Sequence, residues 1–390
     1  MRKNRYLSVV SEIMTEFARL TGLSPSGNTP GRYLWTDAFA VCNFLELYRQ
    51  TGDAEYRELA LRLVDQVHTI LGRHREDDKR TGWISGLNKQ EGIKHPTIGG
   101  LRIGKKLNER RPGDVFDEDL EWDRDGQYYH YLTKWMHALN CVSRVTGNAA
   151  YLAWAMELAK TAHAGFTYLP SSGSRKRMYW KMSIDLSYPL VESMGHLDSL
   201  DGFVTYSRLQ AATKKFGTGK FPDLDAEIAD MAAICEGLSW VTDDPLGIGD
   251  LLLNALKLLQ LITNGNINGK DLLVNLLNSS FQGLQYVANS NSLKLPAEYR
   301  LAFREFGLSI GLHAVEKIRD LIGRNPAFFR RKDPVHGWIE SLMRHVPMAD
   351  MIENFWLEST NRKAGTWTEH QDINTVMLAT SLAPDGYIEC

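Results

Sequence analysis

Apolar residues recur along most of the chain at helical spacing. One clear stripe of them consists of Tyr56, Leu59, Ala60, Leu63 and Val67. Residues three or four positions apart share one face of a helix. Clusters of Gly, Pro, Asn and Asp interrupt the pattern, and no series of alternating apolar and polar residues competes with it. The pattern predicts an all-α protein with twelve helices, at about residues 4–20, 35–50, 53–72, 126–145, 148–165, 198–215, 223–238, 248–263, 270–289, 297–320, 336–357 and 370–382.

Part of this pattern is an internal repeat. Residues 51–56, Thr-Gly-Asp-Ala-Glu-Tyr, recur as residues 146–151, Thr-Gly-Asn-Ala-Ala-Tyr, at an offset of 95 residues. In each copy the glycine is expected to end one helix in a left-handed conformation, and Asp53 or Asn148 is expected to cap the next helix. The repeat therefore predicts tight helical hairpins. His68 and His163 occupy equivalent positions in the two copies and are expected to serve packing.

Two connections are much longer than the usual loop. They span residues 74–125 and 166–197. Loops of that length in a compact domain usually cover a functional site or carry small elements of their own. We expect both to lie over the pocket face of the fold.

Composition narrows the class of protein. The 390 residues are 43% hydrophobic and carry a formal net charge of −2, which is typical of a soluble globular protein. No basic domain stands out, so nucleic acid is not an expected partner. The most apolar window, residues 251–262, is too short to span a bilayer, and Glu12 and Glu16 interrupt any signal-peptide pattern. We therefore expect no membrane association and a cytoplasmic location.

The four cysteines, Cys42, Cys141, Cys235 and Cys390, are far apart and form no Cys-x-x-Cys motif. This spacing indicates neither a disulfide framework nor a zinc ribbon, and the cysteines are expected to be buried or reduced thiols. No cluster of cysteine and histidine has metal-ligand spacing along the chain, so no metal and no cofactor are predicted.

Six helical hairpins in one chain can close into a double ring of inner and outer helices. The helix count resembles the (α/α)6 toroid of six-hairpin glycosidases, polysaccharide lyases and sugar epimerases. Residues 35–39 (Trp-Thr-Asp-Ala-Phe) through 51–57 (Thr-Gly-Asp-Ala-Glu-Tyr-Arg) are similar to the opening hairpin of the unsaturated glucuronyl hydrolases and related enzymes. The resemblance implies one toroid domain over residues 1–390 and an enzyme that acts on a small sugar or an oligosaccharide.

In such a ring the starts of the inner helices surround a pocket. Several predicted inner-helix starts combine tryptophan with acidic residues, and a sugar needs both aromatic faces and polar groups. The residues expected to bind substrate are Trp35, Trp122, Asp123, Gln127, His130, Asp198, Asp201, Asp250, Trp367 and Asp372.

The leading hypothesis is a glycoside hydrolase with Asp125 as general acid. Its partner carboxylate is expected to be Asp37 or Glu369, at about 5–5.5 Å in a retaining enzyme or about 6.5–9.5 Å in an inverting one. A second hypothesis is a sugar isomerase or epimerase that uses His196 and His370 as acid and base.

A plainer explanation exists for each of these residues. Acids at helix starts are favoured as caps and by the helix dipole, whatever the function. A single histidine is more often a structural residue than a catalytic one. A third hypothesis is therefore a non-catalytic helical toroid that binds a ligand or a partner.

Overall fold

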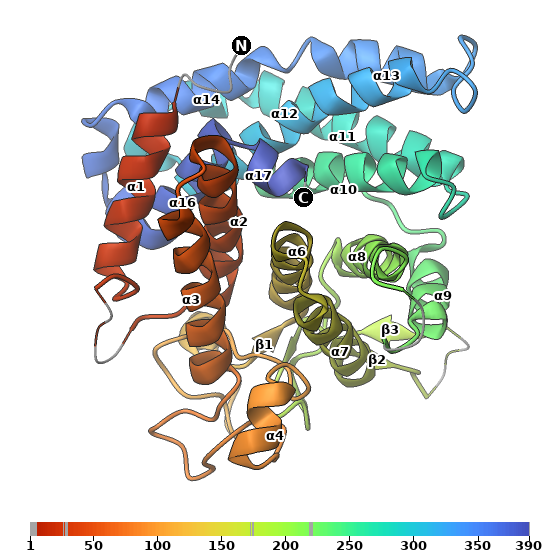
Figure 1. Cartoon of the computed structure of the whole chain (residues 1–390). Helices are drawn as coiled ribbons and strands as arrows, with labels where there is room; N and C mark the ends of the chain where they lie inside the picture. The colour runs from red at the N-terminus through yellow and green to blue at the C-terminus, as the bar shows by residue number, and fades with distance from the viewer. Residues whose placement is uncertain are drawn as a thin grey trace. The chain divides into compact units, whose positions relative to one another are not determined.

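The computed structural model describes residues 6–25, 27, 30–171, 173, 175–217 and 221–389. Cys390 and the first two residues of the predicted helix 4–20 lie outside the described residues. The chain divides into two compact units. The N-terminal unit is Ala18–Glu236, and the C-terminal unit is Gly237–Glu389 together with residues up to Phe17. We describe each unit by itself (Figure 1).

Helical hairpins build the N-terminal unit. Its helices are α2 (Leu34–Thr51), α3 (Ala54–Leu71), α4 (Lys89–Lys94), α5 (Glu118–Asp123), α6 (Tyr129–Thr146), α7 (Ala149–Phe166), α8 (Asp198–Thr213) and α9 (Asp225–Cys235). Helices α2, α6 and α8 pack side by side, and α3, α7 and α9 each pack against the helix that precedes them (Figure 1). Helices α2 and α6 are buried along most of their length, whereas α3 buries one apolar face. The alternation of buried and half-exposed helices agrees with the sequence pattern.

The predicted hairpin turns are confirmed in both repeats. Gly52 and Gly147 end α2 and α6 with φ angles of 74° and 69°. The carboxylate of Asp53 and the side-chain oxygen of Asn148 accept hydrogen bonds from the second residue of α3 and α7. These are the left-handed helix end and the N-cap that the repeated sequence predicts.

Short strands shape the second long connection. A three-stranded antiparallel sheet joins β1 (Gln127–Tyr128), β4 (Lys181–Met182) and β5 (Pro189–Val191), and β2 (Thr167–Tyr168) pairs with β3 (Arg177–Met178). The pairing of Tyr128 with Lys181 ties this connection to the start of α6. Both long connections thus carry small elements of their own, as expected, and these elements have no repeating sequence pattern.

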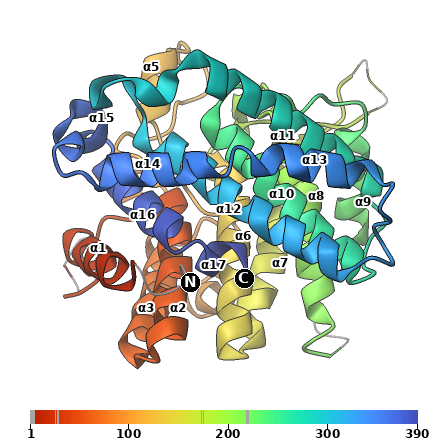
Figure 2. The ribbon, with the colours of Figure 1, turned by 90° about the horizontal axis from the view of Figure 1, so that it is seen from above.

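The C-terminal unit is also helical. It contains most of α1 (Leu7–Leu20), then α10 (Pro245–Thr263), α11 (Lys270–Ser290), α12 (Ala302–Arg324), α13 (Pro334–Met343), α14 (Pro347–Leu357), α15 (Gly365–Thr368), α16 (Gln371–Leu382) and α17 (Asp385–Ile388), with 3-10 turns at Ser292–Lys294, Ala297–Tyr299 and Asn361–Lys363. Helix α12 packs against α10, α14 and α16, and α13 packs against α11. Helices α13 and α14 follow one another in Figure 2.

Two of the predicted helices in this unit are wrong in detail. The single helix expected at 336–357 is two helices, because Pro347 lacks an N–H and its ring clashes with a helical carbonyl four residues earlier. The helix expected at 297–320 begins only at Ala302, after a 3-10 turn. Helix boundaries are the least reliable part of a sequence-based assignment.

A buried polar network joins three helices of the C-terminal unit. The Glu353 carboxylate on α14 lies 2.6 Å from Nε2 of His313 on α12. It also accepts hydrogen bonds from the hydroxyls of Ser309, on α12, and Ser381, on α16, at 2.8 and 2.9 Å. The buried Glu353 carboxylate therefore has hydrogen-bond partners inside the core.

Among the described helices, α10 alone has the length and apolar composition to cross a membrane, and 72% of its apolar window is buried inside the protein. The core helix of a soluble protein has the same properties, so this helix is weak evidence for a membrane span.

The turn at Gly147 makes a first prediction. Gly147→Ala should lower the free energy of unfolding by about 1 kcal/mol, because a residue with a Cβ is strained in the left-handed region. Gly147→Asn should cost less, since asparagine tolerates that region. Urea unfolding of both variants measures the difference. Equal losses for alanine and asparagine would contradict the conformational explanation.

His68 makes a second prediction, on pH. Burial lowers the pKa of His68 to about 3, and the Trp135 indole N–H donates to its Nε2 at 3.1 Å. The unfolded chain, with a pKa of about 6.5, takes up the proton first, so stability is lost as pH falls below about 6.5. Between pH 7 and 5 this loss should be roughly 2 kcal/mol. Urea unfolding of His68→Gln should show a pH dependence weaker by that amount. An unchanged pH dependence would show that His68 is not the source of this loss of stability.

Candidate functional site

The starts of three packed helices bring several of the predicted residues together in the N-terminal unit. Trp35 lies in the first turn of α2, His130 in the first turn of α6, and Asp198 and Asp201 in the first turn of α8. Since α6 packs against both α2 and α8, these side chains meet at one place. The sequence-based expectation that polar residues gather at alternate helix starts therefore fits this unit.

Aromatic rings form the wall of this site. We call Tyr33, Trp35, Tyr128, His130, Tyr131 and Trp180 the aromatic cluster. The ring centroids of Tyr131 lie 5.3 Å from Trp35 and 5.2 Å from Tyr128. The Trp180 ring lies nearly parallel to His130, at 6.3 Å and 17°. Trp35 and Tyr128 are buried, whereas the other four are half-buried and present part of their surface.

Two tyrosines of the cluster supply hydroxyl groups. The Tyr33 and Tyr131 oxygens lie 2.6 Å apart. Burial raises the pKa of Tyr33 to about 12 and that of Tyr131 well above its usual value. Both phenols therefore stay protonated at neutral pH. One hydroxyl donates to the other, so the second hydroxyl is left to donate to a polar ligand.

His130 of the aromatic cluster lies beside Asp198. His130 Nδ1 lies 3.6 Å from Asp198 Oδ1, which is longer than a hydrogen bond. Burial, with a smaller contribution from the charge of Lys134, lowers the pKa of His130 to about 3. The imidazole is therefore neutral at physiological pH, and 24% of its side chain is exposed. A neutral imidazole beside a carboxylate can accept a proton or a hydrogen bond from a ligand.

A buried ion pair lies directly beneath this pair. Lys134 Nζ donates to Asp201 Oδ2 at 3.0 Å, and both side chains are almost completely buried. The same ammonium group lies 5.9 Å from the Trp35 ring centroid. Asp201 is thus neutralised within the protein, and Lys134 connects the aromatic cluster to α8.

Asp125 has the environment of an anchor and not of a general acid. Its carboxylate is 0% exposed and accepts hydrogen bonds from Arg75 and Arg102 at 3.2 and 2.9 Å. The backbone N–H groups of Gly104 and Gly126 donate to its other oxygen at 2.9 and 3.1 Å. All of these partners donate to a carboxylate that is fully enclosed, so no substrate can reach it. Asp125 therefore holds the first long connection against the start of β1.

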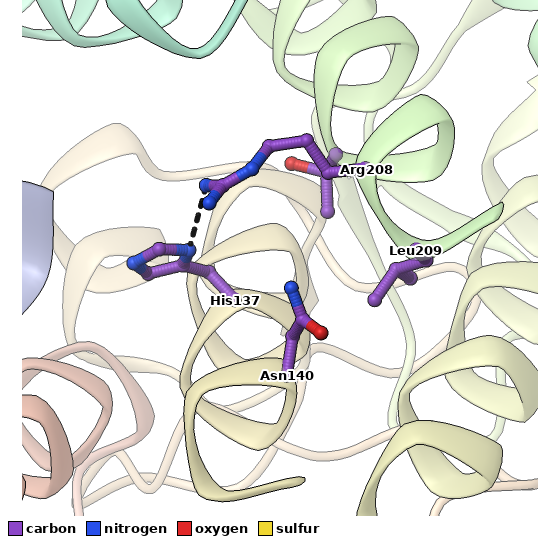
Figure 3. A pocket seen from close by; sticks show the side chains of 5 residues that line it. His137, Asn140, Arg208 and Leu209 are labelled. Atoms are coloured by element: carbon purple, nitrogen blue, oxygen red, sulfur yellow. Dashed lines mark hydrogen bonds between the residues drawn. The ribbon is translucent and has the colours of Figure 1, made fainter. Parts of the chain in front are cut away.

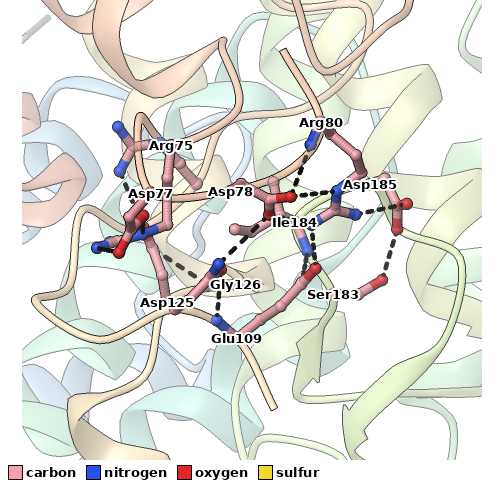
Figure 4. A network of polar contacts seen from close by, with 12 residues as sticks. Arg75, Asp77, Asp78, Arg80, Glu109, Asp125, Gly126, Ser183, Ile184 and Asp185 are labelled. Carbon is pink, nitrogen blue, oxygen red and sulfur yellow. Dashed lines mark hydrogen bonds and ion pairs between the residues drawn. The ribbon is translucent and has the colours of Figure 1, made fainter. Parts of the chain in front are cut away.

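A wider ionic network extends from this anchor (Figure 4). Arg80 donates to Asp78 and Asp185 at 2.7 and 2.8 Å and also pairs with Glu109. The Glu109 carboxylate in turn accepts the backbone N–H of Ile184. This network links residues 75–80 of the first long connection to residues 183–185 of the second.

Asp37 is likewise held by partners within the unit. Arg32 donates to one of its oxygens at 3.3 Å, and the backbone N–H of Tyr33 donates to the other at 3.0 Å. The carboxylate is buried at the first turn of α2. This geometry fits the plainer explanation, a residue that closes the start of its helix.

Four further predicted residues of this unit are structural or exposed. The Gln127 amide donates to the carbonyls of Gly99 and Ile184 at 3.1 and 2.7 Å and is structural. Trp122 is 47% exposed and meets Trp180 edge to face at 5.6 Å. Asp123 and His196 are exposed.

The remaining predicted residues belong to the C-terminal unit. Trp367 is a core residue that packs against Trp356 at 5.5 Å. Glu369, His370 and Asp372 are exposed around the junction of α15 and α16, and Asp250 is half-buried in α10. Their convergence with the residues of the N-terminal unit stays a prediction.

Sequence reasoning missed part of the site. Lys134 follows His130 by one helical turn, so helical spacing alone could have indicated that it shares the same face. Tyr33 precedes its helix, and Trp180 comes from the second long connection. Trp180 reaches the cluster only because β4 pairs with β1, and no local pattern predicts that pairing.

Comparisons with known proteins bear on the fold. No protein-family model matches the sequence, and no curated protein matches it. The structure is similar to the α-mannanase of glycoside hydrolase family 76 from Bacteroides thetaiotaomicron, with a TM-score of 0.55, 10% identity and 96% of each chain covered. The chain has the (α/α)6 toroid fold. The toroid predicted from the helix pattern is thereby confirmed.

Two cellobiose 2-epimerases also superimpose on the toroid. The enzyme from Spirochaeta thermophila has a TM-score of 0.48 and 12% identity, and covers 98% of this chain and 99% of its own. The enzyme from Bacillus thermoamylovorans has a TM-score of 0.43 and 11% identity, and covers 82% of this chain and 76% of its own.

The anchor makes a third prediction. Asp125→Asn should lower the free energy of unfolding by about 3–5 kcal/mol, because it leaves two largely buried arginines without their carboxylate. Asp123→Asn, two residues away and exposed, should change it by less than about 0.5 kcal/mol. Thermal and urea unfolding of the two variants test this. An Asp125→Asn protein of unchanged stability that has lost activity would restore the general-acid hypothesis.

Proposed function

We propose that the chain is a carbohydrate-active enzyme whose sugar-binding site is the aromatic cluster with Asp198, supported from beneath by the buried Lys134–Asp201 ion pair. The observation that carries the proposal is the position of the His130–Asp198 pair against half-buried aromatic rings. Aromatic faces pack against the C–H surfaces of a sugar, and convergent polar groups fix its hydroxyls. The toroid fold is compatible with this function but does not decide it.

Glycoside hydrolysis remains the leading reaction. We assign the reactive carboxylate in the N-terminal unit to Asp198 in place of Asp125 and Asp37, because arginines hold both of those acids in buried contacts. Asp198 faces a histidine instead and lies beside the exposed part of the cluster. The predicted substrate is a small sugar or an oligosaccharide.

A second candidate reaction is isomerisation or epimerisation of a sugar. The position of His130 favours it, because imidazole is a common general base and His130 lies in the aromatic cluster beside the Asp198 carboxylate. Removal of a proton from carbon then requires that the bound substrate raise the pKa of His130 above the value of about 3 that burial gives it. In this version His130 takes the role that the sequence suggested for His196. A cytoplasmic location is part of either proposal.

Our fourth prediction is that the chain turns over a sugar and that this turnover depends on Asp198 and His130. Assays of a panel of sugars in D2O test it and distinguish the two candidate reactions. The panel contains gluco-, manno- and glucurono-disaccharides together with their monosaccharides. Hydrolysis creates reducing ends without deuterium on carbon, whereas epimerisation leaves deuterium on the recovered sugar. Asp198→Asn and His130→Asn should each lower kcat on the true substrate by about 100-fold or more.

A matched control separates catalysis from helix capping. Asp225 is an exposed acid in the first turn of the neighbouring helix α9. Asp225→Asn should keep full turnover and similar stability. Full turnover by both Asp198→Asn and His130→Asn would sink the proposed site. Calorimetric sugar binding without any turnover would favour a non-catalytic toroid.

A further inference from the structure

A second cluster of reactive side chains lies deeper in the N-terminal unit. Cys42 on α2 and His137 and Cys141 on α6 are all buried. The Sγ atoms of Cys42 and Cys141 are 4.0 Å apart, and Cys141 Sγ lies 3.7 Å from His137 Nε2. All three candidate ligand atoms lie within 4.8 Å of one another. The sugar site uses none of these residues.

The spacing of these atoms is close to that of a metal site. Zinc binds thiolate sulfur at about 2.3 Å and imidazole nitrogen at about 2.0–2.1 Å, so tetrahedral ligand atoms lie roughly 3.5–3.8 Å apart. The distances of 4.0 Å between the two sulfur atoms and 3.7 Å between Cys141 and His137 are close to these values, and the remaining distance is no longer than 4.8 Å. His137 and Cys141 share one helix face because they are four residues apart, and Cys42 comes from the helix packed against that face.

The oxidation state of Cys141 decides whether the cluster can bind a metal. Cys141 is disulfide-bonded, whereas Cys42 and Cys235 are thiols. The expectation of buried or reduced thiols therefore holds for Cys42 and Cys235, whereas Cys141 is buried but oxidised. A dithiol or phosphine reductant donates two electrons to the disulfide and is itself oxidised, and two protons complete two thiols. A metal ion then displaces the thiol protons of Cys42 and Cys141.

We propose that the reduced chain binds one zinc-class divalent ion through Cys42, His137 and Cys141. Thiolate and imidazole ligands select soft or borderline ions over magnesium and calcium. Three protein ligands leave a fourth position, which a water molecule or a group outside the cluster fills. The site is independent of the proposed activity, because it lies two to three helical turns along α6 from His130.

Arg208 opposes metal binding and so provides a test of the geometry. It lines a small pocket with His137, Asn140, Thr205 and Leu209 (Figure 3). Its guanidinium nitrogen lies 3.3 Å from His137 Nδ1. An arginine can only donate, so Nδ1 accepts and the proton of the neutral ring sits on Nε2. Zinc at Nε2 requires the opposite tautomer, and the arginine charge repels the ion.

Zinc itself is the probe in the first experiment, on the full chain. The protein is reduced with a phosphine, desalted without oxygen, and titrated with Zn²⁺, and bound zinc is measured by mass spectrometry together with free thiols. We expect one equivalent of zinc after reduction and none before. Co²⁺ should give a thiolate charge-transfer band at the same stoichiometry. A fully reduced chain that binds no zinc overturns the proposal.

Variants assign the ligands. Cys42→Ser and His137→Asn should each weaken zinc binding by at least about 100-fold. Loss of a residue that only hydrogen-bonds to a metal ligand already lowers metal affinity by up to about 100-fold, and loss of a ligand should lower it at least as much. Cys235→Ser removes a buried thiol elsewhere in the same unit and should bind zinc normally. Far-UV circular dichroism checks that each variant is folded. Equal loss in Cys235→Ser would mean non-specific thiol binding and would refute the site.

Arg208→Met distinguishes a metal site from a cluster that only packs in the core, because only a metal site predicts tighter zinc binding in this variant. Removing the guanidinium should tighten zinc binding by about 10-fold, the effect of about 1.4 kcal/mol of repulsion. Unchanged or weaker binding in a folded Arg208→Met protein would contradict the proposed ligation through His137 Nε2.

Discussion

Burial of α6 on several sides is the constraint on which the N-terminal unit depends. The helix packs against α2, α7 and α8, and most of its residues are buried. A polar group on such a helix must find a partner or stay neutral, because an unpaired charge in the interior is costly. His130, Lys134, His137 and Cys141 follow one another at helical spacing along it. They are the polar residues with which the two candidate sites are built.

Each group on this stripe meets the constraint in its own way. Lys134 keeps its charge by pairing with Asp201, whereas burial keeps His130 neutral. His137 and Cys141 lie against each other and against Cys42. Both the aromatic cluster at the start of the helix and the cysteine and histidine cluster further along thus follow from the need of buried polar groups to be paired or neutral. They differ because only the first has half-exposed aromatic rings around it.

The sequence predicts the helices and the repeat because both depend on local chemistry. Apolar spacing places the buried faces, and Gly147 with Asn148 defines a hairpin turn without any tertiary information. The site is harder to predict, since it depends on which helix starts meet. Trp35, His130 and Asp198 were identified from their positions, but their contact needs α6 to lie between α2 and α8. The Cys42 contact, across helices far apart in sequence, has no sequence signal.

The acids show why position alone is an incomplete guide. Asp125 and Asp198 both lie near a helix start and are both buried, yet their partners differ. Asp125 faces two arginines, which are always protonated and hold its carboxylate by charge-assisted hydrogen bonds. Asp198 lies beside the imidazole of His130, which burial keeps neutral and which can accept a hydrogen bond or a proton. A carboxylate held by guanidinium groups anchors a fold, and one that shares its place with an imidazole can take part in proton transfer. The identity of the partner, which only the tertiary structure supplies, therefore separates the anchor from the candidate catalytic acid.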